Sequence, residues 1–245
     1  AKNNSGDCYD MGRGTEQDHN KAFYWYQTAA ENGNASGQNN LAYAYYNGRG
    51  VAQNYEKAFY WYQKAAEQGH ASGQNNVGDC YDLGRGVPQD YEKAFYWYEK
   101  AAGQGNASAQ NSLGDCYDMG RGVAQDYKKS IYWYEKAAGQ GNASGQNNLA
   151  YAYSYGRGIT QNYDKAFYWY EKAAEQGNSA GQNNLGYAYE NGQGVAQDYE
   201  KAFYWYQKAA AQGNTSGQNN LGDCYDTGRG VPQDYEKAFY WYEKA

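Results

Sequence analysis

The tryptophans of this 245-residue chain recur at a constant interval. Each successive one lies 36 residues after the last, at Trp25, Trp61, Trp97, Trp133, Trp169, Trp205 and Trp241. The tripeptide GRG keeps the same spacing, with GQG in its place at 192–194. Self-similarity at a fixed period indicates a repeat array, in which each unit packs on its neighbours. Because no insertion interrupts the period, we expect residues 1–245 to form one continuous array, with both ends falling within a repeat.

Each unit is expected to contain two helices. In the unit at 72–105, the first helix is expected over roughly 72–83, where Gly84 begins a GRG tripeptide with C-cap chemistry. Asp90 suits the N-cap of a second helix, which should run to about Ala102. A helix pair this short cannot bury enough surface alone, so stacked neighbours must complete the core. The pattern predicts an all-α protein of about seven such repeats.

Composition excludes several other classes of protein. The mean hydropathy of −1.11 would by itself suggest disorder, but 18% of the residues are aromatic and supply the burial that aliphatic residues otherwise provide. The net charge is −6 and no basic run is present, which argues against a nucleic-acid partner. No apolar stretch is long enough to predict a membrane span.

The chain resembles the Sel-one-like repeat (SLR) family, a relative of the tetratricopeptide repeats. The resemblance lies in the combined spacing A–xx–Q–xx–LG–xx–Y–xx–GRGV–xx–D–xx–KA–xx–WY–xx–AA–xx–G. The resemblance covers essentially all 245 residues. It implies a right-handed α/α superhelical solenoid, with the first helices lining a concave groove and the second helices on the convex face. It also implies a scaffold or adaptor and no enzymatic activity.

The recurring word KAFYWYQKAA places four aromatic residues side by side at 59–62. On a helical wheel, Phe59, Trp61 and Tyr62 share a broad apolar arc and are expected in the core, whereas Tyr60 points into the polar arc. The outward ring recurs in every repeat, at Tyr24, Tyr60, Tyr96, Tyr132, Tyr168, Tyr204 and Tyr240. This exposed row either docks a partner or lies over neighbouring lysine stems.

The other face of interest belongs to the first helices. One asparagine recurs in every repeat, followed by a pair of positions that hold Asp, Tyr, Ser or Glu. If the family geometry applies, this surface is an acidic, amide-rich and partly aromatic groove that suits a basic or polar extended peptide. The candidate partner-binding residues are Asn39, Tyr43, Tyr46, Asn75, Asp79, Asp82, Asn111, Asp115, Asp118, Asn147, Tyr151, Asn183 and Tyr187. The alternative is a solvated face whose carboxylates are neutralised by the arginines at Arg49, Arg85 and their equivalents.

The cysteine and histidine residues do not indicate a catalytic or metal site. The four cysteines, Cys8, Cys80, Cys116 and Cys224, share one repeat position that holds alanine in other repeats, which indicates a small buried side chain. Equivalent atoms in adjacent repeats are expected ~10 Å apart, beyond disulfide reach. We therefore expect free thiols, no disulfide, no metal and no cofactor. His19 and His70 have no nucleophile or ligand partner in the pattern, so no catalytic residue is assigned.

Five Asn-x-Ser/Thr sequons are present, at Asn3, Asn34, Asn106, Asn142 and Asn214. Four of them occupy the loop before a first helix, where Asn and Ser are also good N-caps. In a secretory route these positions are candidates for N-glycosylation. The sequence does not set the compartment: it would be secreted or secretory-lumenal if the sequons are used, and cytoplasmic otherwise.

Two functions follow from these observations. The first is a non-enzymatic scaffold that binds a protein or peptide partner in its groove. The second is a structural protein that stacks end to end with further copies of itself into a filament, with the tyrosine row and the sequons outward. The near-identity of the repeats supports the filament hypothesis nearly as well as the scaffold hypothesis. A groove that binds one peptide usually needs different side chains in each unit.

Overall fold

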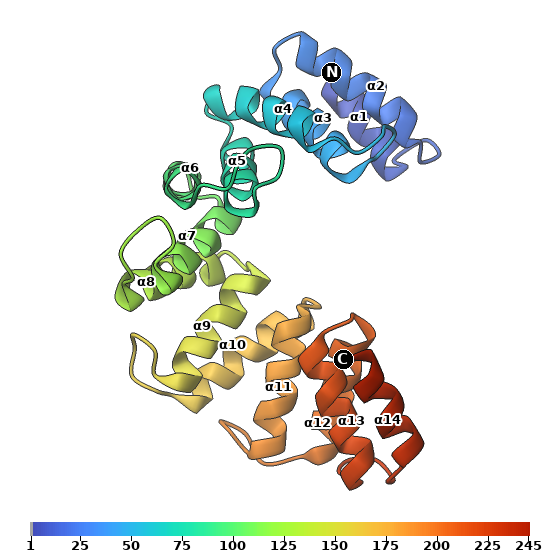
Figure 1. Ribbon diagram of the computed structural model, residues 1–245, viewed down its shortest axis with the longest axis vertical. Coiled ribbons are helices and arrows are strands. Elements are labelled where there is room, and N and C mark those ends of the chain that lie inside the picture. Colours follow the sequence, from blue (N-terminus) through green and yellow to red (C-terminus); the bar gives the residue numbers. More distant parts are fainter. Residues whose placement is uncertain (1) are drawn as a thin grey trace. The chain divides into compact units, whose positions relative to one another are not determined.

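The computed structural model describes residues 2–245, and every regular element among them is a helix (Figure 1). The first helices of the repeats are α1 (Lys2–Met11), α3 (Ala35–Asn47), α5 (Ala71–Leu83), α7 (Ala107–Met119), α9 (Ala143–Tyr155), α11 (Ser179–Asn191) and α13 (Thr215–Thr227). The second helices are α2 (His19–Glu31), α4 (Tyr55–Glu67), α6 (Tyr91–Gly103), α8 (Tyr127–Gly139), α10 (Tyr163–Glu175), α12 (Tyr199–Ala211) and α14 (Tyr235–Lys244). This confirms the predicted all-α array of two-helix repeats.

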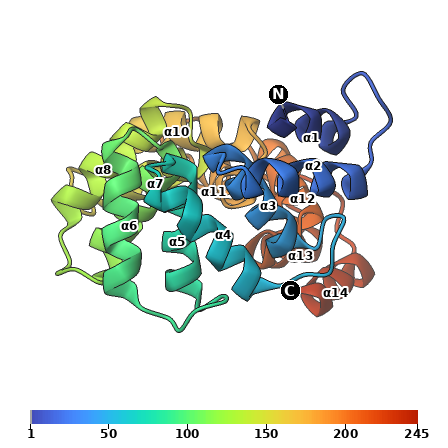
Figure 2. The same ribbon diagram turned by 90° about the horizontal axis from the view of Figure 1, so that it is seen from above.

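The described chain divides into two compact units, one ending at Gln125 and the other running from Asp126 to Ala245. In the first unit, each helix from α1 to α6 packs against the next one in sequence. In the second unit, each helix from α8 to α13 does the same (Figure 2). Within each unit, every inner helix therefore lies between its two sequence neighbours, as expected of stacked repeats.

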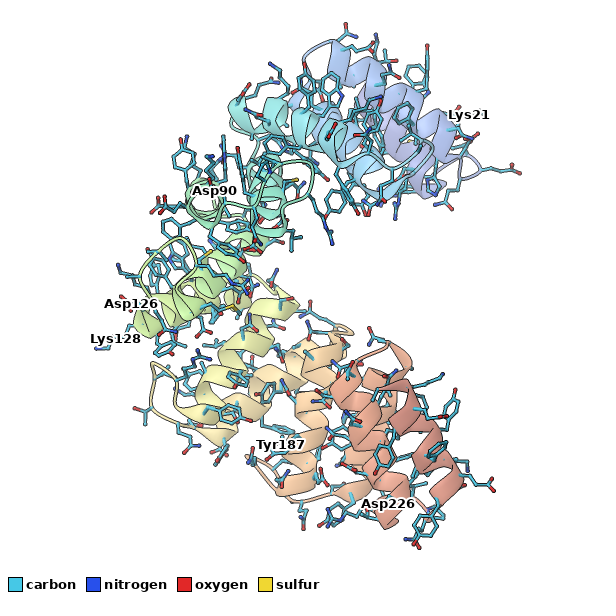
Figure 3. All side chains as sticks on the ribbon, viewed as in Figure 1. Lys21, Asp90, Asp126, Lys128, Tyr187 and Asp226 are labelled. Carbon is cyan, nitrogen blue, oxygen red and sulfur yellow. The ribbon has the colours of Figure 1, made fainter. Side chains whose placement is uncertain are left out.

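Capping residues at the helix ends fix the helix bounds. Asp90 lies at the start of α6 (Figure 3), and its carboxylate accepts the backbone N–H of Lys93 at 3.0 Å. At the C-terminal end of α5, Gly84 terminates the helix in the left-handed conformation with φ 64°. The predicted helix bounds for this repeat are within one residue of those observed, because both depend on local capping.

The GRG loop also ties each repeat to the one before it. Gly86 has φ 75°, and a Cβ placed on it would clash with the carbonyl oxygen of Tyr55, at the start of the preceding repeat's second helix. Glycine is thus required here for two independent reasons, its backbone conformation and the close approach of another backbone.

The core is built from alanine, tyrosine and a few aliphatic side chains. In the second repeat, Tyr62 is 3% exposed, Phe59 and Trp61 are half-buried, and Tyr60 is 52% exposed. Phe59 meets the ring of Tyr81 in the next repeat edge-on, with centroids 5.3 Å apart. The predicted division of the four adjacent rings into three inner and one outer is therefore observed, and the inner rings join neighbouring repeats.

The cysteine position is buried in three of its four occurrences. Burial raises the pKa of the Cys80, Cys116 and Cys224 thiols to about 12. Cys8 is exposed, so the expectation of a buried side chain is wrong for this residue. Cys80 packs against the second helix of the preceding repeat, and within residues 2–245 no earlier repeat is present to cover Cys8.

Within residues 2–245, no helix is both long and apolar enough to cross a membrane.

Candidate interaction surface

The recurring asparagines and the paired positions lie together on the first helices, and we call this face the first-helix surface. Its most prominent side chains are Tyr43, Tyr151 and Tyr187, which are 40–43% exposed (Tyr187 is labelled in Figure 3). The predicted carboxylates Asp79 and Asp82 are half-buried. The remaining predicted members are half-buried as well, namely Asn39, Tyr46, Asn111, Asp115, Asp118, Asn147 and Asn183.

Asn75 departs from the expected pattern. It is only 7% exposed, so its side chain is not presented to a partner, and its assignment as a direct contact residue is corrected. The amide nitrogen of Asn75 instead donates to the carboxylate of Asp79 at 3.0 Å. Its amide is thus part of the polar network beneath the surface.

Tyrosine hydroxyls from the second helices hold the first carboxylate in three of the pairs. Tyr98 donates to Asp79 at 2.8 Å, Tyr26 donates to Asp7 at 2.9 Å, and Tyr242 donates to Asp223 at 2.7 Å. Burial raises the pKa of Asp79 to about 6, against the opposing effect of the Tyr98 hydrogen bond. These tyrosines therefore orient the carboxylates as well as packing between the helices.

Arginines of the GRG loops reach back to the second position of several pairs. Arg49 lies 3.6 Å from Asp10, Arg121 lies 3.9 Å from Asp82, and Arg229 lies 3.4 Å from Glu190. Where the second position is Tyr46, Arg85 donates to the tyrosine hydroxyl instead. The expected acidic groove is therefore a mixed-charge surface, in which each of these carboxylates has a guanidinium from the following repeat.

One pocket of about 340 Å³ opens on this surface between α1, α2 and α3. Asp10 lies on its wall, 2.9 Å from His19 Nδ1 and paired with Arg49. Asp7 accepts from both Tyr26 and Asn40, and Phe23 and Tyr43 also contribute rings to the lining. His19 stands where the other repeats have tyrosine. The pocket's carboxylates are therefore already held by the protein's own donors.

The outer tyrosine row lies on the second helices. Its seven rings are 47–62% exposed, and each meets the ring of the following tryptophan at 4.9–5.6 Å between centroids. In six of them a lysine four residues on lies 4.5–5.9 Å above the tyrosine ring. The exception is Tyr24, which is followed by Thr28 at that position. The rings thus have intramolecular cation–π partners, in the arrangement expected if the row lies over lysine stems.

Four of the five sequon asparagines cap the N-termini of helices. Asn34, Asn106, Asn142 and Asn214 are N-caps whose side-chain oxygens accept a backbone N–H three residues on. Asn3 lies inside α1, where its amide donates to Asp7. The cap uses the side-chain oxygen, and glycosylation at these positions stays a prediction.

No group of three or more His, Cys, Asp or Glu residues within 2–245 is arranged to hold a metal ion.

The asparagine contacts between repeats were not foreseen from the sequence, although one signal was present. The asparagine doublet NN recurs with the repeat, and its second member reaches the preceding repeat, as Asn76 does by donating to Asn39 at 3.0 Å.

These features define the class of protein, an all-α solenoid of helix pairs that presents a polar and aromatic first-helix surface. A family model for the Sel1 repeat matches the chain seven times, at residues 1–34, 35–70, 71–106, 107–142, 143–178, 179–214 and 215–245. The chain belongs to the Sel1 repeat family. Proteins of this family are often interaction scaffolds, and the fold is typically non-enzymatic.

Solved structures show the same architecture. A Sel1 repeat protein from Oxalobacter formigenes is 31% identical with a TM-score of 0.85, and the match covers 99% of this chain and 96% of that one. The protein c5321, a protective antigen of uropathogenic Escherichia coli strains with an SLR fold, is 42% identical with a TM-score of 0.73. That match covers 99% of this chain but only 52% of c5321, so this chain spans about half of its length. The Pseudomonas aeruginosa immunity protein Pa5087, 22% identical over 83% of this chain and 80% of its own with a TM-score of 0.58, shares the fold alone. No curated protein sequence matches the chain.

Proposed function

We propose that this protein is a non-enzymatic scaffold that binds an extended polypeptide segment along its first-helix surface. The observation that carries the proposal is the exposure of Tyr151 and Tyr187 on adjacent repeats of the second unit, beside half-buried amides and the carboxylate of Glu190. Tyrosine provides large contact area with a polar tip, and it is enriched among the residues that dominate binding energy. Asparagine amides both donate and accept, which suits them to a peptide backbone.

Peptide display on the purified chain tests this proposal. Selected peptides should lose binding by about tenfold or more when Tyr151 and Tyr187 are each changed to alanine, because each change removes a central aromatic contact. Isothermal titration calorimetry with the selected peptides measures the loss.

The outer tyrosine row provides matched controls within the same chain. Tyr60→Ala, Tyr168→Ala and Tyr204→Ala remove rings of similar exposure from the second helices, and these changes should leave peptide affinity unchanged. Failure to select any peptide, or loss of binding only in the row variants, would contradict the proposal.

A further inference from the structure

The first residue of the second helix is tyrosine in every repeat except the first, where it is His19. The six tyrosines are Tyr55, Tyr91, Tyr127, Tyr163, Tyr199 and Tyr235. In four of these repeats, the arginine of the following GRG loop lies over the tyrosine ring, 4.6–5.7 Å from its centroid. This position therefore supplies an aromatic ring for a guanidinium, in the arrangement of a cation–π contact.

Arg49 is the arginine that would lie over such a ring in the first repeat. An imidazole is smaller than a phenol, and Nδ1 of His19 lies 2.9 Å from the carboxylate of Asp10. Arg49 lies instead over the ring of Tyr43, 5.2 Å from its centroid. The Arg49 side chain is 43% exposed, so a ligand can reach it. The histidine thus leaves Arg49 without the ring that four other arginines of the GRG loops contact.

The pocket of about 340 Å³ between α1, α2 and α3 lies at this histidine. Its lining includes His19 and Arg49, and it extends along α2 to Ala22 and Phe23. Ligand pockets in proteins have volumes of roughly 300–1,000 Å³, so this pocket is at the lower end of that range.

The equivalent pocket between α5, α6 and α7 shows what the tyrosine does. Tyr91 is present at the start of α6, and the pocket there has only about 150 Å³. Tyr98 of α6 lines it, but Phe95, the counterpart of Phe23, does not. We attribute the larger volume and the access to Phe23 in the first repeat to the exchange of tyrosine for histidine.

The remaining lining of the larger pocket suits an uncharged aromatic group. Phe23, Tyr26 and Tyr43 contribute rings that can meet another ring edge-on or offset. The carboxylates of Asp7 and Asp10 already have donors within the protein. A cation is therefore not needed to neutralise them, and the aromatic walls favour a ring.

We propose that this pocket seats an aromatic side chain, phenylalanine or tyrosine, of a bound polypeptide. The guest ring takes the place that the protein's own tyrosine takes in the other repeats. Arg49 provides the cation for its face, and Phe23 provides an aromatic wall. This inference rests on the proposed function, because it takes the ligand to be a polypeptide segment at the first-helix surface.

The test is an NMR titration of the full chain with short peptides of Ser, Gly and Ala that carry one central residue: phenylalanine, tyrosine, cyclohexylalanine or alanine. The only histidines of the chain are His19 and His70, so their imidazole signals are readily distinguished. The ring current of a bound phenylalanine or tyrosine should shift the signals of His19 and leave those of His70 in place.

The affinities of the four peptides test the chemistry of the guest. The phenylalanine and tyrosine peptides should bind about tenfold or more tightly than the alanine peptide. They should also bind about threefold or more tightly than the cyclohexylalanine peptide, whose ring has a similar size but no π face. Unmoved His19 signals, or equal affinity of the phenylalanine and cyclohexylalanine peptides, would overturn the assignment of an aromatic ring.

Two changes at one position separate the space in the pocket from the imidazole itself. His19→Tyr restores the residue of the other six repeats and should abolish binding of the phenylalanine peptide, because the pocket is filled. His19→Ala removes the imidazole but leaves the pocket open, so it should retain binding. The peptide's own ring signals report the affinity of both variants, and circular dichroism checks that both are folded. Binding retained by His19→Tyr, or lost by folded His19→Ala, would contradict the proposal.

The two proposals fail in different ways. If displayed peptides bind through Tyr151 and Tyr187 while the phenylalanine peptide leaves His19 unmoved, the inference is wrong and the proposed function stands. If neither the displayed peptides nor the phenylalanine peptide binds, both are wrong.

Discussion

A single side chain begins each first helix from α3 onward, and its chemistry differs in one repeat. Asn34, Asn106 and their equivalents accept a backbone N–H through an amide oxygen that does not titrate. At the same position His70 accepts the N–H of Gly73 through Nδ1 at 3.1 Å. A histidine nitrogen can accept only while it is unprotonated. Burial also lowers the pKa of His70, so the start of α5 depends on the neutral ring.

This dependence gives a pH prediction for His70. Because its folded-state pKa lies below the ordinary value of about 6.5, the unfolded state binds more protons in the window just below that pH. The stability that neutral His70 provides is complete above about pH 6.5 and is lost as the pH falls toward the folded-state pKa. His70→Asn should abolish this loss, which we expect to be up to about 1 kcal/mol, the typical value of an N-cap.

Urea unfolding of the original chain and of His70→Asn at a series of pH values measures the difference. The two curves of unfolding free energy should converge at alkaline pH and separate as the pH falls below about 6.5. Parallel curves would show that His70 is not the titrating cap. Because both chains retain His19 and every carboxylate, their contributions cancel in the comparison.

The loops of this chain depend on glycine in two distinguishable ways. Gly86, in the loop between the two helices of a repeat, combines φ 75° with a backbone so close to the Tyr55 carbonyl oxygen that a Cβ would clash with it. Gly105, in the loop between repeats, has φ 87° but open space where a Cβ would lie. The first loop is constrained by packing and conformation, and the second by conformation alone.

Alanine substitution separates these two constraints. Gly105→Ala should cost roughly 1–2 kcal/mol of unfolding free energy, the cost of a left-handed conformation for a residue with a Cβ. Gly86→Ala should cost more, because α4 and the loop must also move apart. Chemical denaturation of both variants gives the comparison, and equal losses would show that the contact with Tyr55 is relaxed at no cost.

The helices were predictable from the sequence because their determinants are local. The N-cap at Asp90 and the C-cap at Gly84 depend on residues a few positions apart. The helical-wheel pattern that separates Tyr60 from Tyr62 is equally local. The contacts of the first-helix surface were not predictable in the same way. Whether one repeat's arginine or asparagine reaches the preceding repeat depends on how the two are rotated and shifted against each other. For the same reason the sequence pattern places Asn75 on the surface, although its neighbours enclose it.

Within each unit, the contacts between repeats use the same few positions. Three kinds of contact join one repeat to the following one. A carboxylate pairs with an arginine, an acceptor asparagine pairs with a donor asparagine, and a backbone carbonyl oxygen packs against a GRG loop. Most repeats carry both members of such pairs, one for each neighbour, although Ser112 replaces a donor asparagine and Tyr46 replaces a carboxylate. Removing one complete repeat should therefore leave the two new neighbours with matching partners.

Deletion of residues 35–70, one repeat of the family match, tests this. It brings Asn76 to face Asn3 and Arg85 to face Asp10, which replaces Asn40 and Arg49 with identical residues. The shortened chain should keep the same helix content per residue by circular dichroism and unfold cooperatively at a lower temperature, because it has one interface fewer. Deletion of 35–54 alone removes α3 without its partner helix, and it should give an aggregating or partly unfolded product. A whole-repeat deletion that behaves like this control would contradict the idea of interchangeable interfaces.

The recurring amide hydrogen bond between repeats, such as the one from Asn76 to Asn39, has a consequence for how such a chain changes over generations. A gene that gains or loses 36 codons by unequal recombination encodes a protein whose new junction again joins a donor amide to an acceptor amide. We therefore expect the fold to tolerate changes in copy number better than changes of the same size that cut through a repeat.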